Sequence, residues 1–294
     1  MKKSTDYHQD LLILFDAYVH GAIDRRGFLD GAAKYCAAGV TASMLLDELS
    51  PKFAEAQQVP ADDKRLTIER LEYDSPQGSG KMKGYLARPA DAKGKKLPVV
   101  VVVHENRGLN PHIEDIARRI ALDGYMAFAP DALTPLGGYP GTEDEARNLF
   151  PKLDQTKTRE DFVTAVAVMK ARKDGTGKVA VVGFCYGGAI ANMLAVRVPD
   201  LAGSVPFYGT QPKAEEVPSI KAPLLIHYAG TDERVNAGWP AYKAALDANK
   251  KVYDVHIYEG TQHGFNNDTT PRYDATAAKL AWSRTMEFFK KNLK

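Results

Sequence analysis

The feature that most constrains the fold of this chain is a glycine-rich turn between two apolar segments. The run Lys178–Gly183 is typical of a strand, and Ala189–Val196 is typical of a helix. Between them stands Gly183-Phe184-Cys185-Tyr186-Gly187-Gly188. This is the strand–turn–helix pattern G-x-nucleophile-x-G, the nucleophile elbow, with cysteine as the central residue. The turn is so sharp that side chains two residues before or after its tip would clash, so glycine is needed there.

Cys185 at the tip of this turn is the candidate nucleophile. It precedes a helix, and the positive end of the helix dipole favours a thiolate over a thiol. The alternative is a structural cysteine buried in a glycine-rich turn. The strand and helix on either side favour the nucleophile.

Strands and helices alternate from Leu66 onward. The expected strands are Leu66–Tyr73, Lys81–Arg88, Leu97–His104, Tyr125–Ala129, Lys178–Gly183, Gly203–Tyr208, Pro223–Tyr228 and Val252–Tyr258. The expected helices are Ile113–Asp123, Thr158–Lys173, Gly187–Val198, Trp239–Asn249 and Tyr273–Asn292. This order predicts an α/β fold with a doubly wound, mostly parallel sheet, entered by an antiparallel hairpin at one edge. The Gly- and Pro-rich stretch 131–151 is expected to form a loop over the site.

The first 56 residues form a separate N-terminal extension, and residues 57–294 form the α/β domain. Arg25-Arg26, the weakly apolar stretch 31–46 and Ala54-Glu55-Ala56 resemble a twin-arginine export signal, which predicts a periplasmic protein. The alternative is a helical, amphipathic segment that stays attached to a cytoplasmic protein. No segment has the roughly 18 apolar residues that a transmembrane helix requires.

Charge and cysteine content exclude several classes of protein. The 39 basic and 37 acidic residues give a net charge of +2 and are well mixed, which argues against a nucleic-acid partner or a polybasic membrane patch. The two cysteines, Cys36 and Cys185, lie in segments too different in character to suggest a disulfide framework. No pair of Cys or His at ligand spacing is present, so the sequence predicts neither a metal site nor a cofactor.

A cysteine nucleophile needs a base and a group that orients the base. His263 lies in the polar, glycine-flanked loop Gly260–Phe265, between the last strand and the last helix. The candidate acid is Asp232, just after a strand end, with Glu233 as the rival next to it. The order nucleophile, acid, histidine is that of α/β-hydrolases, and each residue follows a strand's carboxyl end. The expected oxyanion donors are the backbone N–H groups of Tyr186 and Asn106.

These motifs, together with Glu105 directly after the central strand, resemble the dienelactone hydrolase family, also called carboxymethylenebutenolidase-like. The resemblance covers about Leu66–Leu293. It implies an α/β-hydrolase fold and a triad of Cys185, His263 and Asp232. It also implies that Glu105 contacts the thiol and takes its proton when substrate arrives. The alternative for Glu105 is a salt bridge to Arg107 or Arg118.

The chain departs from the family where the substrate carboxylate is expected to bind. Asn267 stands where the family pattern has an arginine after the histidine, and residues 130–134 also lack one. An amide does not replace a bidentate arginine. Arg107 and Arg234 supply positive charge at other positions. The candidate substrate-binding side chains are Arg107, Tyr139, Phe265 and Asn267.

The function that follows from these residues is hydrolysis of an ester or lactone in a small molecule, through an acyl-enzyme on Cys185. Two alternatives remain at this point. One is a redox-active or thiol-sensing protein that uses Cys185 without acyl transfer. The other is an α/β-hydrolase fold that serves as a binding module without catalysis.

Overall fold

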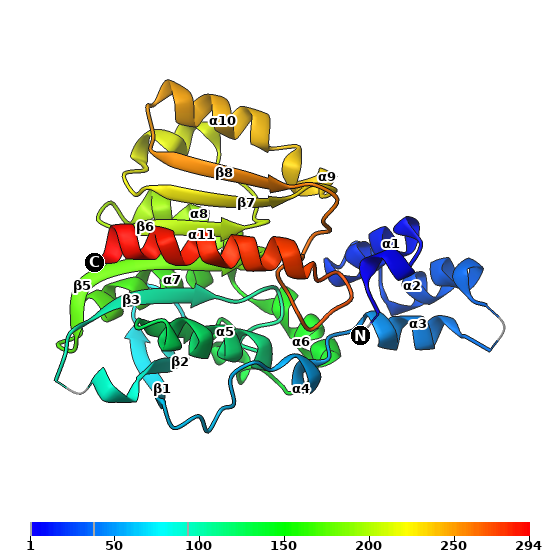
Figure 1. Ribbon diagram of the computed structural model, residues 1–294, viewed down its shortest axis with the longest axis horizontal. Helices are drawn as coiled ribbons and strands as arrows, with labels where there is room; N and C mark the ends of the chain where they lie inside the picture. The colour runs from blue at the N-terminus through cyan, green and yellow to red at the C-terminus, as the bar shows by residue number, and fades with distance from the viewer. Residues whose placement is uncertain (1, 38, 93) are drawn as a thin grey trace.

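The computed structural model describes residues 2–37, 39–92 and 94–294 and is built around one eight-stranded sheet (Figure 1). The strands are β1 (Leu66–Ser75), β2 (Gly80–Pro89), β3 (Leu97–Val103), β4 (Met126–Pro130), β5 (Gly175–Phe184), β6 (Gly203–Phe207), β7 (Leu224–Ala229) and β8 (Tyr253–Tyr258). Their order in the sheet is β1-β2-β4-β3-β5-β6-β7-β8. The β1–β2 and β2–β4 pairs are antiparallel, and the strands from β4 to β8 run parallel. The predicted sheet with its antiparallel edge hairpin is confirmed.

Helices cover both faces of the sheet. The helices are α1 (Gln9–Val19), α2 (Arg25–Ala32), α3 (Ala42–Leu49), α4 (Phe53–Ala56), α5 (Pro111–Leu122), α6 (Glu143–Leu149), α7 (Gln155–Lys170), α8 (Tyr186–Arg197), α9 (Glu233–Asn236), α10 (Trp239–Ala248) and α11 (Ala275–Leu293). Among them, α5 and α11 pack on one face, and α7 and α8 pack on the other. The expected helices lie within about three residues of the observed ones. None of the helices in the described ranges is long and apolar enough to cross a membrane.

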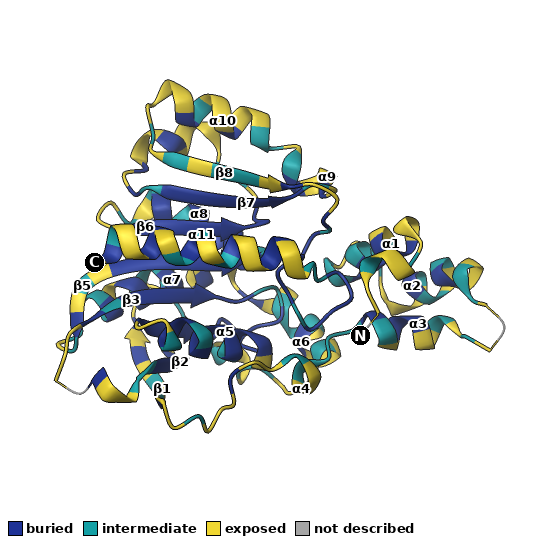
Figure 2. Ribbon diagram, in the orientation of Figure 1, coloured by how far each residue is buried: buried dark blue, intermediate teal, exposed yellow. Residues whose placement is uncertain are grey.

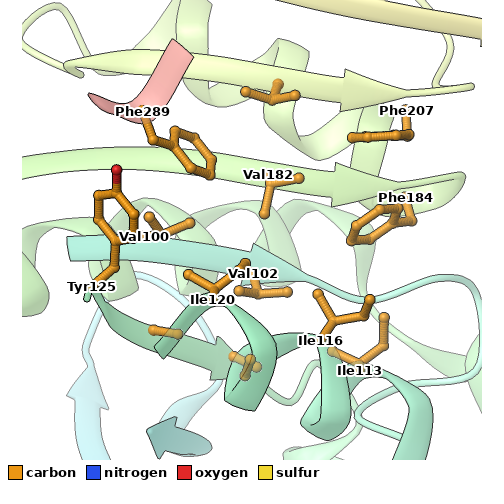
Figure 3. Close-up of a cluster of buried hydrophobic side chains, with 14 of the residues drawn as sticks. Val100, Val102, Ile113, Ile116, Ile120, Tyr125, Val182, Phe184, Phe207 and Phe289 are labelled. Atoms are coloured by element: carbon orange, nitrogen blue, oxygen red, sulfur yellow. The ribbon is translucent and has the colours of Figure 1, made fainter. Parts of the chain in front are cut away.

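The central strand β3 shows why the sheet needs helices on both sides. Val100 and Val102 contribute to the core under α5 and α11, and Val99, Val101 and Val103 to the core under α7 and α8. Successive side chains of a strand point to opposite faces, so a run of valines buries both. Figure 3 shows the first of these cores, where Val100 and Val102 lie near Ile113, Ile116 and Phe289, and Figure 2 shows the buried strands at the centre of the molecule.

The stretch 131–151 differs from the expected loop because it contains helix α6. Thr142 caps this helix: its Oγ1 accepts from the Glu145 N–H at 3.3 Å and donates to the Glu145 carboxylate at 2.8 Å. A threonine at the N-cap that accepts from the backbone N–H of the third helical residue is a helix-start signal. The sequence interpretation considered only the glycines, prolines and aspartates of this stretch.

The N-terminal extension forms a small helical unit with a core of its own. Leu12, Phe15, Phe28, Leu45 and Leu49 are buried together there. In Figure 1 helices α1–α3 lie at the end of the sheet toward which the parallel strands point. The twin arginines lie in the first turn of α2, and residue 38 of the stretch 31–46 lies outside the described residues. Export by the twin-arginine route stays a prediction.

Candidate active site

The elbow holds Cys185 in a backbone conformation that few non-glycine residues adopt, with φ 55° and ψ −113°. The glycines around it are required by close approach. A Cβ on Gly183 would lie 1.9 Å from the carbonyl oxygen of Gly187, and a Cβ on Gly187 would lie 2.2 Å from that of Val103. Helix α8 therefore begins directly against the sheet, with the Cys185 side chain at its N-terminus.

His263 and Asp232 form a buried pair beside this thiol. The Nδ1 of His263 lies 2.5 Å from the Asp232 Oδ2, and the other carboxylate oxygen accepts from the Val235 N–H at 3.2 Å. The two residues are only 6 % and 5 % exposed. Glu233, the rival acid, is exposed. The carboxylate thus fixes the imidazole through Nδ1 and leaves Nε2, which has no hydrogen-bond partner among the described residues, for the site.

A second histidine, His20 of the extension, also reaches the thiol. Its Nε2 lies 3.2 Å from the Cys185 Sγ, and its ring stands edge-on to that of His263 with centroids 4.8 Å apart. The Nδ1 of His20 lies 2.9 Å from the Asp16 carbonyl oxygen and 3.2 Å from its Oδ2. The sulfur therefore lies near two histidines, each held at Nδ1 by an aspartate.

The turn after α1 places His20 at the site. His20 is the last residue before Gly21, whose φ of 78° ends the helix. The Gly21 and Ala22 N–H groups donate back to the carbonyl oxygens of Tyr18 and Ala17, the pattern of a Schellman motif. A histidine at the negative end of a helix is also stabilised as a cation. The sequence interpretation assigned His20 to the extension and missed it. The His-Gly pair at the end of an apolar helix was the available signal.

The charges around the sulfur favour a thiolate. Burial raises the pKa of the Cys185 thiol, but the positive charges of His20 and His263 and the hydrogen bond with His20 outweigh burial and lower this pKa to about 6. Burial lowers the pKa of His263, but the Cys185 charge and the Asp232 hydrogen bond raise it to about 10. The pKa of His20 is raised, because Cys185 and Asp16 outweigh its burial. The directions of these pKa shifts favour an ion pair of thiolate and imidazolium.

The expected oxyanion donors belong to the first turn of α8 and to the loop after β3. Tyr186 is the first residue of α8, so its backbone N–H has no acceptor within the helix. Asn106 follows β3, and its side-chain amide donates to the Val19 carbonyl oxygen at 3.0 Å. The loop that carries the second proposed donor is thus fastened to the extension.

The carboxylate of Glu105 accepts from the Asn267 side-chain amide at 2.9 Å, and the thiol has a hydrogen-bond contact with His20. Proton uptake by Glu105 when substrate arrives stays a prediction. Among the described residues, Glu105 forms no salt bridge with Arg107 or Arg118. Arg107 donates to the carbonyl oxygens of Asn106 and Val19, and Arg118 pairs with Asp115. The neighbour of the Glu105 carboxylate is therefore the side-chain amide of Asn267, and not an arginine.

The four candidate substrate-binding side chains do not line one common pocket. Arg107 and Asn267 line a small pocket with Glu105 beneath the extension. The Tyr139 hydroxyl donates to the Glu143 carboxylate at 3.1 Å. Phe265 is fully buried among Phe207, Tyr208 and Tyr258, so its ring supports the core rather than a pocket wall.

A larger cleft, of about 730 Å³, opens between α1 and the loops that carry Asp232 and His263. Two arginines line it. Arg234 lies 3.1 Å from the His20 Nε2, and Arg272, almost fully buried, donates to Asp16 at 3.1 Å. Arg272 is a second residue that the sequence interpretation missed, because it lies in an irregular segment without a motif. Arg234 thus places a positive charge beside His20, whereas the charge of Arg272 is paired with Asp16.

Comparisons with known proteins agree with this fold. The model of the dienelactone hydrolase family matches residues 82–293, and a model described as YqhI-like matches residues 1–34. A "putative carboxymethylenebutenolidase" of Saccharolobus solfataricus is 32% identical over 255 residues, covering 74% of this chain and 96% of that protein. A "putative hydrolase fragment YghX" of Escherichia coli is 52% identical over 117 residues, covering 40% of this chain and 99% of that protein.

A solved structure gives the same result. A putative dienelactone hydrolase from Klebsiella pneumoniae superposes with a TM-score of 0.66 at 28% sequence identity, covering 76% of this chain and 99% of that one. The fold is therefore that of the α/β-hydrolases, as the order of motifs predicted. With a family model that matches from β2 to the end of α11, the chain belongs to the dienelactone hydrolase family.

Proposed function

We propose that this protein hydrolyses an ester or lactone bond in a small molecule, with Cys185 as the nucleophile. Membership in the dienelactone hydrolase family supports the reaction class. The observation that supports the cysteine mechanism is the buried Asp232–His263 pair, whose unpartnered Nε2 lies on the same site as the elbow sulfur.

The proposed reaction begins with the thiolate. The Cys185 Sγ attacks the acyl carbon, and the Tyr186 and Asn106 N–H groups stabilise the negative oxygen of the tetrahedral intermediate. The imidazolium of His263 then gives its proton to the leaving alkoxide, and a thioester remains on the enzyme.

Deacylation uses the same histidine in its neutral form. His263 takes a proton from water, and the resulting hydroxide attacks the thioester carbon. The second tetrahedral intermediate collapses to the carboxylic acid and the Cys185 thiolate. The proton stays on His263, so the ion pair is restored. Asp232 holds the imidazole in one orientation and stabilises its positive charge in both half-reactions.

The proposed role of Glu105 changes with its contacts. Two imidazoles already lie close to the thiol, so the resting state does not need a carboxylate to remove the proton. Glu105 with Asn267 instead forms one wall of the small pocket that Arg107 also lines. We propose Arg107 and Asn267 as substrate-contacting residues.

The test is hydrolysis of small aryl esters by the wild-type protein, Cys185→Ala and His263→Ala, with Cys36→Ala as the matched cysteine control. We expect losses of at least about a thousandfold for the first two variants and none for the control. Intact mass after exposure of His263→Ala to the ester should show the acyl group on Cys185. Equal rates in all four proteins would end the proposal.

A further inference from the structure

The three groups around the elbow have the composition of a metal site. Among the described residues, one nitrogen of His20, one of His263 and the Cys185 Sγ all lie within 4.8 Å of one another. Two imidazoles and a thiolate are ligands that zinc prefers. The three residues come from segments far apart in sequence, so no local spacing could reveal the cluster.

The outer contacts of both histidines are those of metal ligands. A ligating histidine commonly donates its other ring N–H to a carboxylate or a carbonyl, which fixes the ring and keeps the free nitrogen aimed at the ion. His263 has this contact with Asp232 and His20 has it with Asp16. The His263 Nε2, on a ring that is almost fully buried, has no hydrogen-bond partner in the part of the chain that the structure describes.

The dimensions of the cluster are close to those of a bound ion. Zinc–sulfur and zinc–nitrogen bonds of about 2.3 Å and 2.1 Å put tetrahedral ligand atoms about 3.3–3.6 Å apart. The His20 nitrogen and the sulfur are already 3.2 Å apart. The His263 nitrogen, which lies within 4.8 Å of the other two ligand atoms, must move toward them by at most about an ångström. Arg234, whose side chain is 46% exposed, must turn away from His20 into solvent.

We propose that His20, Cys185 and His263 bind a borderline-soft divalent cation such as Zn²⁺, with a fourth position left for water or an anion. This inference does not rest on the proposed hydrolysis. The ion would occupy the Cys185 Sγ and a His263 nitrogen that the proposed hydrolysis uses, so the bound ion would block that reaction. The proposed site assigns the extension a chemical role, since the third ligand comes from the turn after α1.

The experiment titrates the metal-free, reduced full-length protein with Co²⁺, followed by Zn²⁺ as competitor. A thiolate bound to Co²⁺ gives a charge-transfer band in the near ultraviolet, and a four-coordinate ion gives strong visible bands. We expect one ion per chain, both sets of bands, and their loss when Zn²⁺ displaces Co²⁺. Calorimetry gives the affinity in each variant.

Variants decide which residues hold the ion. His20→Gln should weaken binding at least tenfold, and Asp16→Asn, which removes the carboxylate behind His20, about 10- to 100-fold. Cys185→Ser should lose the charge-transfer band. The matched control is His8→Ser, an exposed histidine of the same extension whose replacement keeps the cap of α1. If His20→Gln fails to fold by circular dichroism, Asp16→Asn decides. The proposal is overturned if both folded variants bind like wild type, or if the band survives in Cys185→Ser.

Discussion

At the scale of single residues, the proposed chemistry depends on one sulfur that lies near two imidazoles. Each imidazole is held by an aspartate, and one of the pairs comes from the extension. The positive charges act at short range in a partly buried site, where they are weakly screened by solvent. The reactivity of Cys185 should therefore depend on a residue outside the α/β domain.

Replacing His20 by Gln should raise the pKa of the Cys185 thiol. A lowered thiol pKa means that the thiolate is present above about pH 6, so alkylation of wild type should rise through that pH. Loss of the His20 charge should move the rise toward higher pH. The measurement is the rate of iodoacetamide labelling of Cys185 against pH, by peptide mass spectrometry in the presence of a chelator. An identical profile in the variant would contradict the assigned effect of His20.

Replacing Asp232 by Asn should slow ester hydrolysis by about three to four orders of magnitude, because the amide no longer stabilises the imidazolium or fixes its tautomer. The readout is kcat/KM. Glu233→Gln, a change at the exposed neighbour, is the control and should keep the wild-type rate. A protein that uses Cys185 only as a redox thiol would be indifferent to the change at Asp232.

At the scale of elements, the elbow joins β5 to α8 through a turn whose close backbone contacts require glycine. The pattern of valines and the glycine spacing were enough to predict the sheet, the elbow and the residues at the strand ends. Helix α6 was not predicted, because a seven-residue helix among glycines and prolines has little periodicity. Its N-cap threonine is the local signal that marks it.

Gly187→Ala should destabilise the fold, because the new Cβ would lie 2.2 Å from the Val103 carbonyl oxygen and neither backbone can easily move. We expect a loss of about 1–3 kcal/mol or more in the free energy of unfolding, measured by urea denaturation. Gly175→Ala is the matched control, since its nearest contacts would be at 3.5 Å. Equal stability of the two variants would refute the close approach as the reason for glycine at this position.

At the scale of the whole molecule, the extension and the α/β domain share the site. Val19 accepts hydrogen bonds from Asn106 and Arg107, and Arg272 pairs with Asp16. No sequence pattern predicts how one segment docks on another, since docking depends on surface shape and charge after folding. For this reason the Cys185, His263 and Asp232 cluster was predicted from the sequence, whereas His20, Asp16 and Arg272 were not.

Asp16→Asn should loosen the extension. Arg272 is almost fully buried, and a buried guanidinium without its carboxylate is costly. We expect faster hydrogen–deuterium exchange of backbone amides in α1 and α2, with little change in β5 and β7. Asp47→Asn, an exposed aspartate of α3, serves as control. Unchanged exchange in α1 would mean that the Arg272 pair does not hold the extension in place.

The contact between His20 and Cys185 spans 165 positions of the chain. Removal of the first residues would therefore change the properties of the thiol. A protease that cleaved the chain after position 20 would remove His20 and with it one positive charge near the Cys185 sulfur. The processed and the unprocessed protein would then differ in the reactivity of Cys185.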